Sequence, residues 1–178
     1  MSSTSRKLHI GGHVRVSGWE VLDANPGAVV DHVGDAGDLG RFETGAFEAV
    51  YASHVLEHFD YKDALGAALR EWHRVLSPGG QLYVSVPDLD VLASLFVLKD
   101  KLTVEERYLV MRMMFGGHID RFDYHLVGLS VDFLATFLGE AGFVNLRKVR
   151  SFGLFEDTSA MLFKGVPISL NVVAEKPR

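Results

Sequence analysis

The residues with the most readable chemistry lie in the segment YASHVLEHF, residues 51–59. His54, Glu57 and His58 have the H-x-x-E-H spacing of a class of zinc hydrolases, in which two histidines bind the metal and the glutamate is the base. Such a site needs a long helix that carries both histidines, and a third ligand later in the chain. Here the motif directly follows a predicted strand, and Asp60 begins a different helix, so we expect no metal site.

Two other interpretations of this segment stay open. In the structural one, Val55 and Leu56 pack, Glu57 lies at the positive first turn of a helix, and His58 is a hydrogen-bonded polar group. In the functional one, His54 faces a ligand cleft and contacts the substrate or accepts a proton from it.

A second group of reactive side chains lies in GGHIDRFDYHLVGLS, residues 116–130. This segment is either a solvated loop between helices or a flap over a substrate, in which Tyr124 or His125 positions the substrate or accepts a proton. His118, Asp120 and His125 have the residue types of a metal site with two histidines and a carboxylate. Their spacing is too loose for us to expect one.

Predicted strands and helices alternate along the chain, and they would position these residues. The strands are expected at 7–10, 19–23, 28–39, 47–53, 81–88, 143–149 and 167–176, and the helices at 64–76, 90–100, 104–115 and 131–142. This alternation predicts an α/β fold with a parallel, doubly wound sheet, and we expect residues 1–178 to form one domain.

Several chemically capable residues fall at the ends of the predicted strands. In a doubly wound sheet, ligands bind beyond the carboxyl ends of the strands. The residues at those ends are Gly11, Gly12, Asp23, Asp35, Ser53, His54, Pro87 and Asp88. Their shared location predicts one ligand site at that edge of the sheet.

Composition narrows the class of protein. The chain has 178 residues, 48% of them hydrophobic, a formal net charge of -5 and no cysteine. These values predict a full core and exclude disulfides and thiolate zinc sites. With no basic block, no apolar run of membrane length and no leader-like core in MSSTSRKLHI, we expect a cytoplasmic protein that binds neither nucleic acid nor membrane. The apolar stretch at 152–163 is a hairpin or a dimer contact, which leaves a homodimer open.

The ordered segments KLHIGG, GWEVLD, VGDAGDL, FEAVYASHVLEHF and RVLSPGGQLYVSVPD resemble small bacterial class I methyltransferases that use S-adenosylmethionine (SAM). The resemblance covers residues 7–90 well and continues weakly through 116–128 and 138–143. It implies a mostly parallel, seven-stranded Rossmann-like methyltransferase sheet with flanking helices, truncated at its N-terminal side. It also implies SAM as the cofactor.

The resemblance also implies a role for each strand end. The glycine turn after the first strand approaches the methionine part of SAM, the acid ending the second strand holds the ribose hydroxyls, and the acid after the third strand binds the adenine amine. Residues after the fourth strand line the methionine end. The implied cofactor-binding residues are Gly11, Gly12, Asp23, Asp35, Ala36, Ser53 and His54. One departure is the first loop, GGHVRVSG, which is short and has Gly-Gly-His in place of the G-x-G core.

The activity implied is methyl transfer from SAM to a small-molecule nucleophile, such as a sugar or a natural-product intermediate. His54, Tyr124 and His125 are the candidate catalytic residues. The main alternative is a Rossmann-like binding or regulatory module without turnover, which the altered first loop motivates. An NAD-dependent oxidoreductase would carry G-x-G-x-x-G after the first strand, and that motif is absent.

Overall fold

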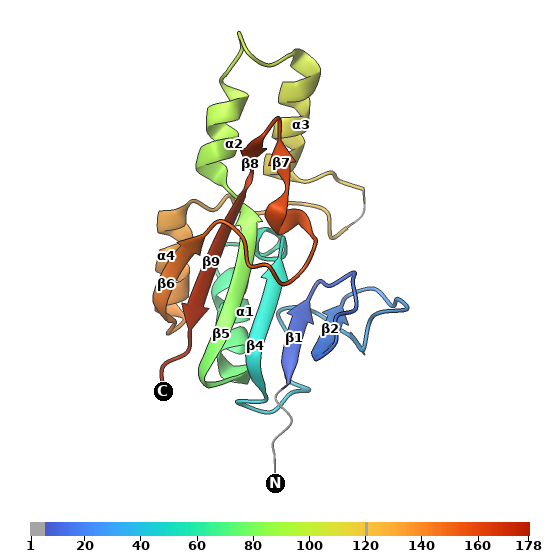
Figure 1. The fold of residues 1–178 in the computed structure, drawn as a ribbon, viewed down its shortest axis with the longest axis vertical. Coiled ribbons are helices and arrows are strands. Elements are labelled where there is room, and N and C mark those ends of the chain that lie inside the picture. Colours follow the sequence, from blue (N-terminus) through green and yellow to red (C-terminus); the bar gives the residue numbers. More distant parts are fainter. Residues whose placement is uncertain (1–5, 120) are drawn as a thin grey trace.

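A seven-stranded sheet forms the centre of the computed structural model, which describes residues 6–119 and 121–178 (Figure 1). Its strands lie in the order β3-β2-β1-β4-β5-β9-β6, and β9 is antiparallel to both of its neighbours while the other pairs are parallel. The bounds are β1 (Lys7–Ile10), β2 (Trp19–Asp23), β3 (His32–Val33), β4 (Phe47–Ser53), β5 (Leu76–Pro87), β6 (Val144–Val149) and β9 (Ser169–Glu175). The predicted mostly parallel, seven-stranded α/β fold is confirmed.

Side-chain caps mark the first residues of α2, α3 and α4 among the helices. The helices are η1 (Leu56–His58), α1 (Ala64–Val75), α2 (Leu89–Phe96), α3 (Val104–Phe115), α4 (Val131–Glu140) and η2 (Thr158–Ala160). Thr103 and Glu106 form a capping box at α3, and the Ser130 hydroxyl accepts a hydrogen bond from the Phe133 amide at α4. A short hairpin, β7 (Leu162–Phe163) and β8 (Val166–Pro167), precedes β9.

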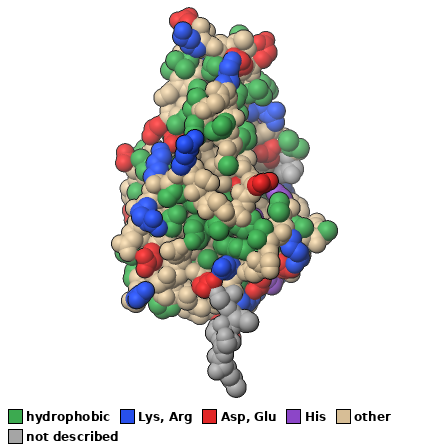
Figure 2. Space-filling model, viewed as in Figure 1, with side chains coloured by type: hydrophobic (Ala, Val, Ile, Leu, Met, Phe, Trp, Pro, Cys, Tyr) green, Lys and Arg blue, Asp and Glu red, His purple; other side chains and the backbone are tan. Residues whose placement is uncertain are grey.

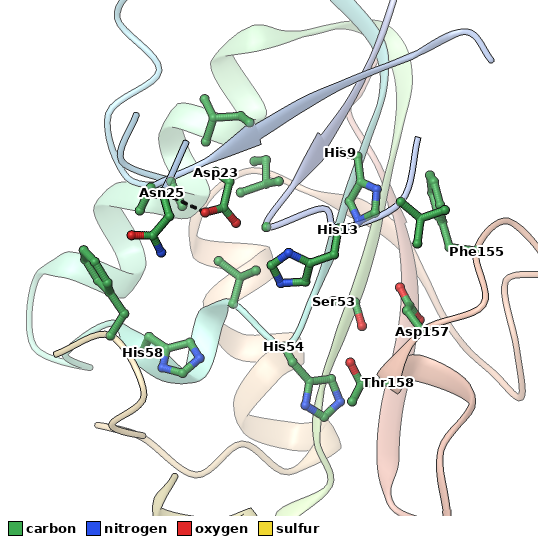
Figure 3. A pocket seen from close by; sticks show the side chains of 18 of the residues that line it. His9, His13, Asp23, Asn25, Ser53, His54, His58, Phe155, Asp157 and Thr158 are labelled. Atoms are coloured by element: carbon green, nitrogen blue, oxygen red, sulfur yellow. Dashed lines mark hydrogen bonds between the residues drawn. The ribbon is translucent and has the colours of Figure 1, made fainter. Parts of the chain in front are cut away.

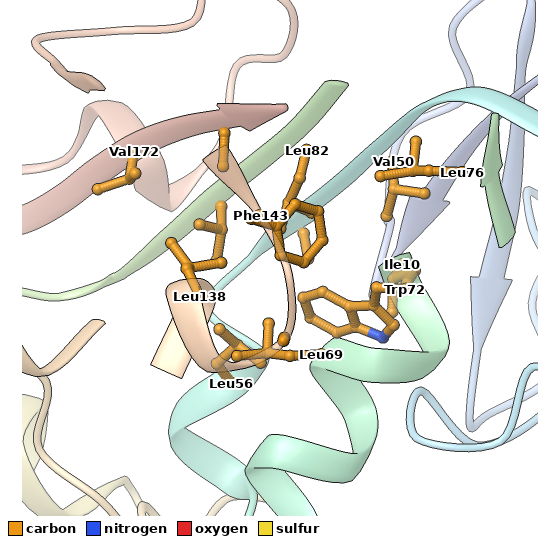
Figure 4. Packing of buried hydrophobic residues seen from close by; sticks show 14 of the residues in the cluster. Ile10, Val50, Leu56, Leu69, Trp72, Leu76, Leu82, Leu138, Phe143 and Val172 are labelled. Carbon is orange, nitrogen blue, oxygen red and sulfur yellow. The ribbon is translucent and has the colours of Figure 1, made fainter. Parts of the chain in front are cut away.

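One face of the sheet is covered by α1 and α4 and contains the main core (Figure 4). The apolar stripe of α1 places Leu65, Leu69 and Trp72 fully inside. They pack with Leu138 of α4 on alternate residues of the central strands, such as Val84. The Trp72 indole N–H also donates to the Ala36 carbonyl at 2.8 Å, which ties this core to the loop after β3.

The opposite face, which we call the loop face, is covered differently. Within residues 6–119 and 121–178 no α-helix lies on it, and the buried residues of its apolar cluster are Trp19, Ala49 and Tyr51. The segment after β6 crosses over these strands and packs Phe152, Leu154 and Phe155 against them. Figure 2 shows hydrophobic side chains gathered on this face, because a loop covers less of a sheet than a helix does.

The third strand is much shorter than predicted. The pattern AVVDHVGDAGDL predicts a strand over 28–39, but β3 has only two residues. The Asp35 carboxylate accepts from the Gly37 amide at 2.6 Å and Asp38 accepts from the Gly40 amide at 3.0 Å, so this stretch forms side-chain-stabilised turns instead of a ladder. These turns place Asp35 beside the end of β2.

Helices α2 and α3 form a separate helical hairpin beyond the carboxyl end of β5 (Figure 1). Leu92, Leu95, Leu102 and Val110 pack there with Ile168 in a second, smaller cluster. None of the helices formed by the described residues has the length and apolar character required to cross a bilayer.

Candidate cofactor-binding cleft

A cleft of about 760 Å³ opens at the carboxyl ends of β1, β2 and β4 (Figure 3). Strand-end residues predicted from the sequence line it: Gly11, Asp23, Asp35, Ala36, Ser53 and His54. They come from four successive parallel strands, whose carboxyl ends share one edge of the sheet. The structure therefore brings six of the seven predicted cofactor residues together, although their binding roles stay predictions.

Gly11 allows the backbone to turn at the floor of the cleft. Its φ of 72° lies in the left-handed region, and a Cβ at this position would lie 2.8 Å from the Val55 Cγ2 atom. The Gly11 amide donates to the Leu22 carbonyl at 2.8 Å, which fixes the turn to β2. The positive φ and the short Cβ distance both favour glycine here.

Gly12 is the predicted residue that does not line the cleft. A Cβ on Gly12 would lie 2.7 Å from the His9 Nδ1 atom, so its glycine makes room for the histidine ring. The next residue is His13, and its ring lines the cleft (Figure 3).

Asp23 and Asp35 each use one carboxylate oxygen to hold the local turn. Asp23 Oδ1 accepts from the Asn25 amide at 2.7 Å, and Asp35 Oδ1 accepts from the Gly37 amide at 2.6 Å. Each carboxylate keeps a second oxygen with capacity to accept further hydrogen bonds. Two oriented carboxylates and a small Ala36 fit the hydroxyls, amine and flat ring of an adenosine, so the residues present suit SAM.

His54 follows β4 with a backbone φ of 56°, which is uncommon for a residue with a side chain and marks strain held by its surroundings. Its Nε2 atom lies 2.9 Å from the Ser169 hydroxyl, and its Nδ1 atom lies 3.4 Å from Glu57 Oε1. Burial lowers the pKa of His54 to about 4, with the charges of His125 and His58 lowering it and that of Asp157 raising it. The ring is therefore neutral at pH 7.

The catalytic roles predicted for Tyr124 and His125 meet a different geometry. Neither residue is among those lining the cleft, whereas their neighbours Phe122 and Asp123 are. The His125 ring packs edge-on against His58 at 5.0 Å, and the Tyr124 ring stacks on His118 at 4.1 Å. Of the metal site considered at His118, Asp120 and His125, Asp120 lies outside the described residues.

The H-x-x-E-H segment does not have the helix that a zinc hydrolase needs. His54 ends up at the strand end, and Leu56–His58 form the three-residue 3-10 helix η1. Glu57 lies in the first turn of η1, as the structural interpretation predicts, but it is buried, and burial raises its pKa to about 8. The protease interpretation is therefore wrong for this segment.

The sequence-based site lacked one wall of the cleft. Phe155, Glu156, Asp157 and Thr158 line it from the segment after β6, far from the strand ends in sequence. The Tyr51 hydroxyl donates to Asp157 Oδ2 at 2.7 Å and anchors this wall. The hint in the sequence is the apolar stretch at 152–163, which predicts a hairpin or a dimer contact. A hairpin begins at the end of that stretch, at 162–167, and the earlier residues 155–158 line the cleft.

His9 also lines the cleft, although its sequence gives no sign of it. The ring lies between Tyr51 at 4.9 Å and Phe155 at 4.1 Å, and burial lowers its pKa to about 4. In β1 its neighbours Leu8 and Ile10 point into the helix-covered core, so strand alternation turns His9 to the loop face.

Comparison with known proteins gives a family match over part of the chain. Residues 19–84 match the family described as a methyltransferase domain. The mouse protein named "Probable tRNA methyltransferase 9B" is 32% identical over 77 residues, which cover 43% of this chain and 17% of that protein. The chain thus spans about a sixth of the length of this curated relative.

Solved methyltransferases share the fold along nearly the whole chain. A SAM-dependent methyltransferase from Archaeoglobus fulgidus superposes with a TM-score of 0.60 at 14% identity, over 97% of this chain and 86% of the other. The Burkholderia thailandensis 1,6-didemethyltoxoflavin-N1-methyltransferase, solved with its substrate and S-adenosylhomocysteine, gives 0.56 at 16% identity, over 98% and 72%. The predicted resemblance is therefore confirmed: residues 19–84 match a methyltransferase domain, and the chain has the fold of these SAM-dependent methyltransferases.

Proposed function

We propose that this protein transfers a methyl group from SAM to a small-molecule nucleophile, for which a sugar or a natural-product intermediate is the expected class. One observation carries the proposal. The ends of four parallel strands place Gly11, Asp23, Asp35 and Ser53 around a single cleft on a methyltransferase fold. This is the edge at which sheets of this kind bind nucleotides.

SAM supplies an activated methyl group on a sulfonium, so the protein mainly contributes proximity and alignment. Asp23 would accept the ribose hydroxyls, Asp35 would accept the adenine amine, and the Gly11 turn would let the methionine part approach the backbone. The cleft walls formed by 155–158 and by Phe122 would exclude water from the reacting end.

The charge of the cleft supports a small acceptor. Among the described residues that line it there is no Lys or Arg, while five are acidic: Asp23, Asp35, Asp123, Glu156 and Asp157. A negative lining attracts a cationic cofactor and repels phosphate backbones. The similarity to a probable tRNA methyltransferase makes RNA the alternative acceptor, and this lining argues against it.

His54 supports a positioning role more than a role as a strong base. A neutral ring can accept a proton, but both of its nitrogens face protein groups, Ser169 and Glu57. We therefore expect the acceptor to be a group that needs little help to lose a proton, or one that loses it after methyl transfer.

Calorimetric titration with SAM and then with S-adenosylhomocysteine tests the cofactor site. We expect Asp23→Ala to weaken binding of both by about 100-fold, since a carboxylate that accepts hydroxyls contributes on the order of 2–3 kcal/mol. Asp38→Ala is the matched control: Asp38 makes the same kind of turn but does not line the cleft. Equal affinity in Asp23→Ala and wild type would contradict the assignment of this carboxylate.

Turnover then separates the enzyme from a binding module. Formation of S-adenosylhomocysteine with a panel of small hydroxyl and amine acceptors is expected, and none with tRNA. SAM that binds but is never consumed with either acceptor class would favour the module without turnover. Methylated tRNA would replace the small-molecule proposal.

A further inference from the structure

Behind the wall of the cleft lies a group of side chains to which methyl transfer assigns no role. Glu57, His58 and His125 each offer one ligand atom, and these atoms all lie within 4.8 Å of one another. Glu57 is 1% exposed, and neither of its carboxylate oxygens has a hydrogen-bond partner among the described residues. A buried carboxyl without a partner is costly, so its surroundings need an explanation.

The two histidines present lone pairs and not protons to this group. His58 Nδ1 lies 3.1 Å from the Tyr124 carbonyl and must donate to it, which leaves Nε2 with a lone pair. His125 Nδ1 is buried and has no partner in the described part of the chain. A neutral His125 that carries its proton on Nε2 therefore has its lone pair on the buried Nδ1 atom.

His54 adds a third lone pair at the same place. The Ser169 hydroxyl donates to the Thr158 carbonyl at 2.8 Å, so it accepts from His54 Nε2–H at 2.9 Å. The lone pair of His54 Nδ1 then faces Glu57 Oε1 at 3.4 Å. An ionised Glu57 would therefore be surrounded by acceptors, and a positive charge or a proton has to lie between them.

We propose that Glu57, His58 and His125 bind a divalent transition-metal ion of the zinc class at the inner wall of the cleft. Two imidazoles and one carboxylate are a ligand set that zinc takes in sites with an open fourth position. His58 also lines the cleft, so the fourth position lies beside it. Metal–ligand distances of about 2.0–2.2 Å require these atoms to close to about 3.3 Å, which small side-chain rotations achieve.

The backbone around the three residues already has the shape of a site. Leu126 donates to the Glu57 carbonyl at 2.7 Å, which holds the His125 segment against η1. The Nδ1 atom of His58 is held by the Tyr124 carbonyl at 3.1 Å, the kind of outer-shell contact that orients metal-binding imidazoles.

The competing explanation is a proton on Glu57 that is shared with His54 Nδ1. It predicts a neutral group with no affinity for metal. The proposal is independent of methyl transfer, because its ligand is the metal alone and SAM is absent from the test.

The experiment uses the whole chain without a histidine tag, stripped with a chelator and titrated with Co²⁺, then Zn²⁺ in competition with a chromophoric chelator. We expect one equivalent per chain and visible Co²⁺ absorption bands of a four- or five-coordinate site. Glu57→Gln and His125→Gln are each expected to lower Zn²⁺ affinity by about 100-fold or more, exceeding the 10–100-fold cost of losing an outer-shell partner. His118→Gln is the matched control, because His118 lies in the same segment, bonded to the Phe115 carbonyl and stacked on Tyr124.

Each other outcome overturns the proposal. Affinity that falls equally in His118→Gln and His125→Gln would show surface histidine binding. Absence of bound metal in a folded wild-type chain would contradict the proposal and favour the shared proton. Preference for Mg²⁺ over Zn²⁺ would contradict it as well, because it would indicate a site of another kind. If Glu57→Gln does not fold, His58→Gln and His125→Gln still decide, because neither removes the buried carboxyl.

Discussion

The two faces of the sheet are covered differently, one by helices and the other by a loop. On the helix-covered face, α1 and α4 bury a continuous apolar cluster that includes Trp72 and Leu138, all of it aliphatic or aromatic. On the loop face, only Trp19, Ala49 and Tyr51 are buried among the apolar residues of the cluster, and His9 is buried beside them. The first face holds the fold together, and the second leaves room for a cleft.

The difference shows which face of the sheet can bury polar side chains together with their hydrogen-bond partners. A buried imidazole or tyrosine hydroxyl has to find partners, and a loop supplies backbone and side-chain groups at varied positions. The segment 157–159 does this for Tyr51 through Asp157 and Ser159. A helix, whose backbone groups are paired internally, presents only side chains to the sheet.

The two tryptophans give the largest expected contrast between the faces. Trp72→Ala empties a fully buried site between rigid elements and should destabilise the protein by ~3–5 kcal/mol. Trp19 lies under a loop that can move into the space left by Trp19→Ala, so we expect about half that loss of stability. Denaturant unfolding of both variants measures this, and equal losses would mean that the loop face is as rigid as the helix face.

Acid should weaken the loop face first, because His9 is buried there with its pKa lowered to about 4. Unfolded His9 binds a proton below its ordinary pKa of about 6.5 and folded His9 does not, so stability is lost as pH falls from about 6.5 to 4. The full shift corresponds to at most about 3 kcal/mol. His9→Gln should flatten the decline in unfolding free energy between pH 7 and pH 4.5; an unchanged slope would assign it to other groups, His54 among them.

Tyr51→Phe removes the hydroxyl that anchors the cleft wall and should have the smallest effect on stability, about 1–2 kcal/mol. Because the wall borders the cleft, SAM affinity should also fall several-fold. Tyr83→Phe is the control: its hydroxyl bonds Gln81 on the same face, and Tyr83 does not line the cleft. Equal SAM affinity in the two variants would show that the wall is held by packing alone.

The sequence predicts the helix-covered face and the strand-end residues well, because both follow from local patterns. The stripe through Leu65, Leu69 and Trp72 has helical spacing, and Asp23 and Ser53 fall at the ends of apolar runs. These signals depend on neighbours within a few residues. They need no knowledge of the tertiary structure.

The rest of the site depends on contacts between distant segments, and local patterns do not contain it. Asp157 joins Tyr51 across more than a hundred positions, and His125 meets His58 across more than sixty. The predicted length of the third strand was wrong for a different reason. Asp35 and Asp38 stabilise turns with their own side chains, which overrides the strand propensity of 28–33. Gly12 does not line the cleft as predicted, because the space beside it is taken by the His9 ring.

Strand β9 runs antiparallel to its neighbours, and this single reversal has an evolutionary consequence. It brings the connection from β6 to β9 to the cleft, opposite the segment that follows α3. Both connections can change in length and sequence while the buried α1–α4 layer stays as it is, since loops tolerate variation that cores do not. A lineage built on this topology can therefore acquire new substrates by rewriting two loops, at little risk to its ability to fold.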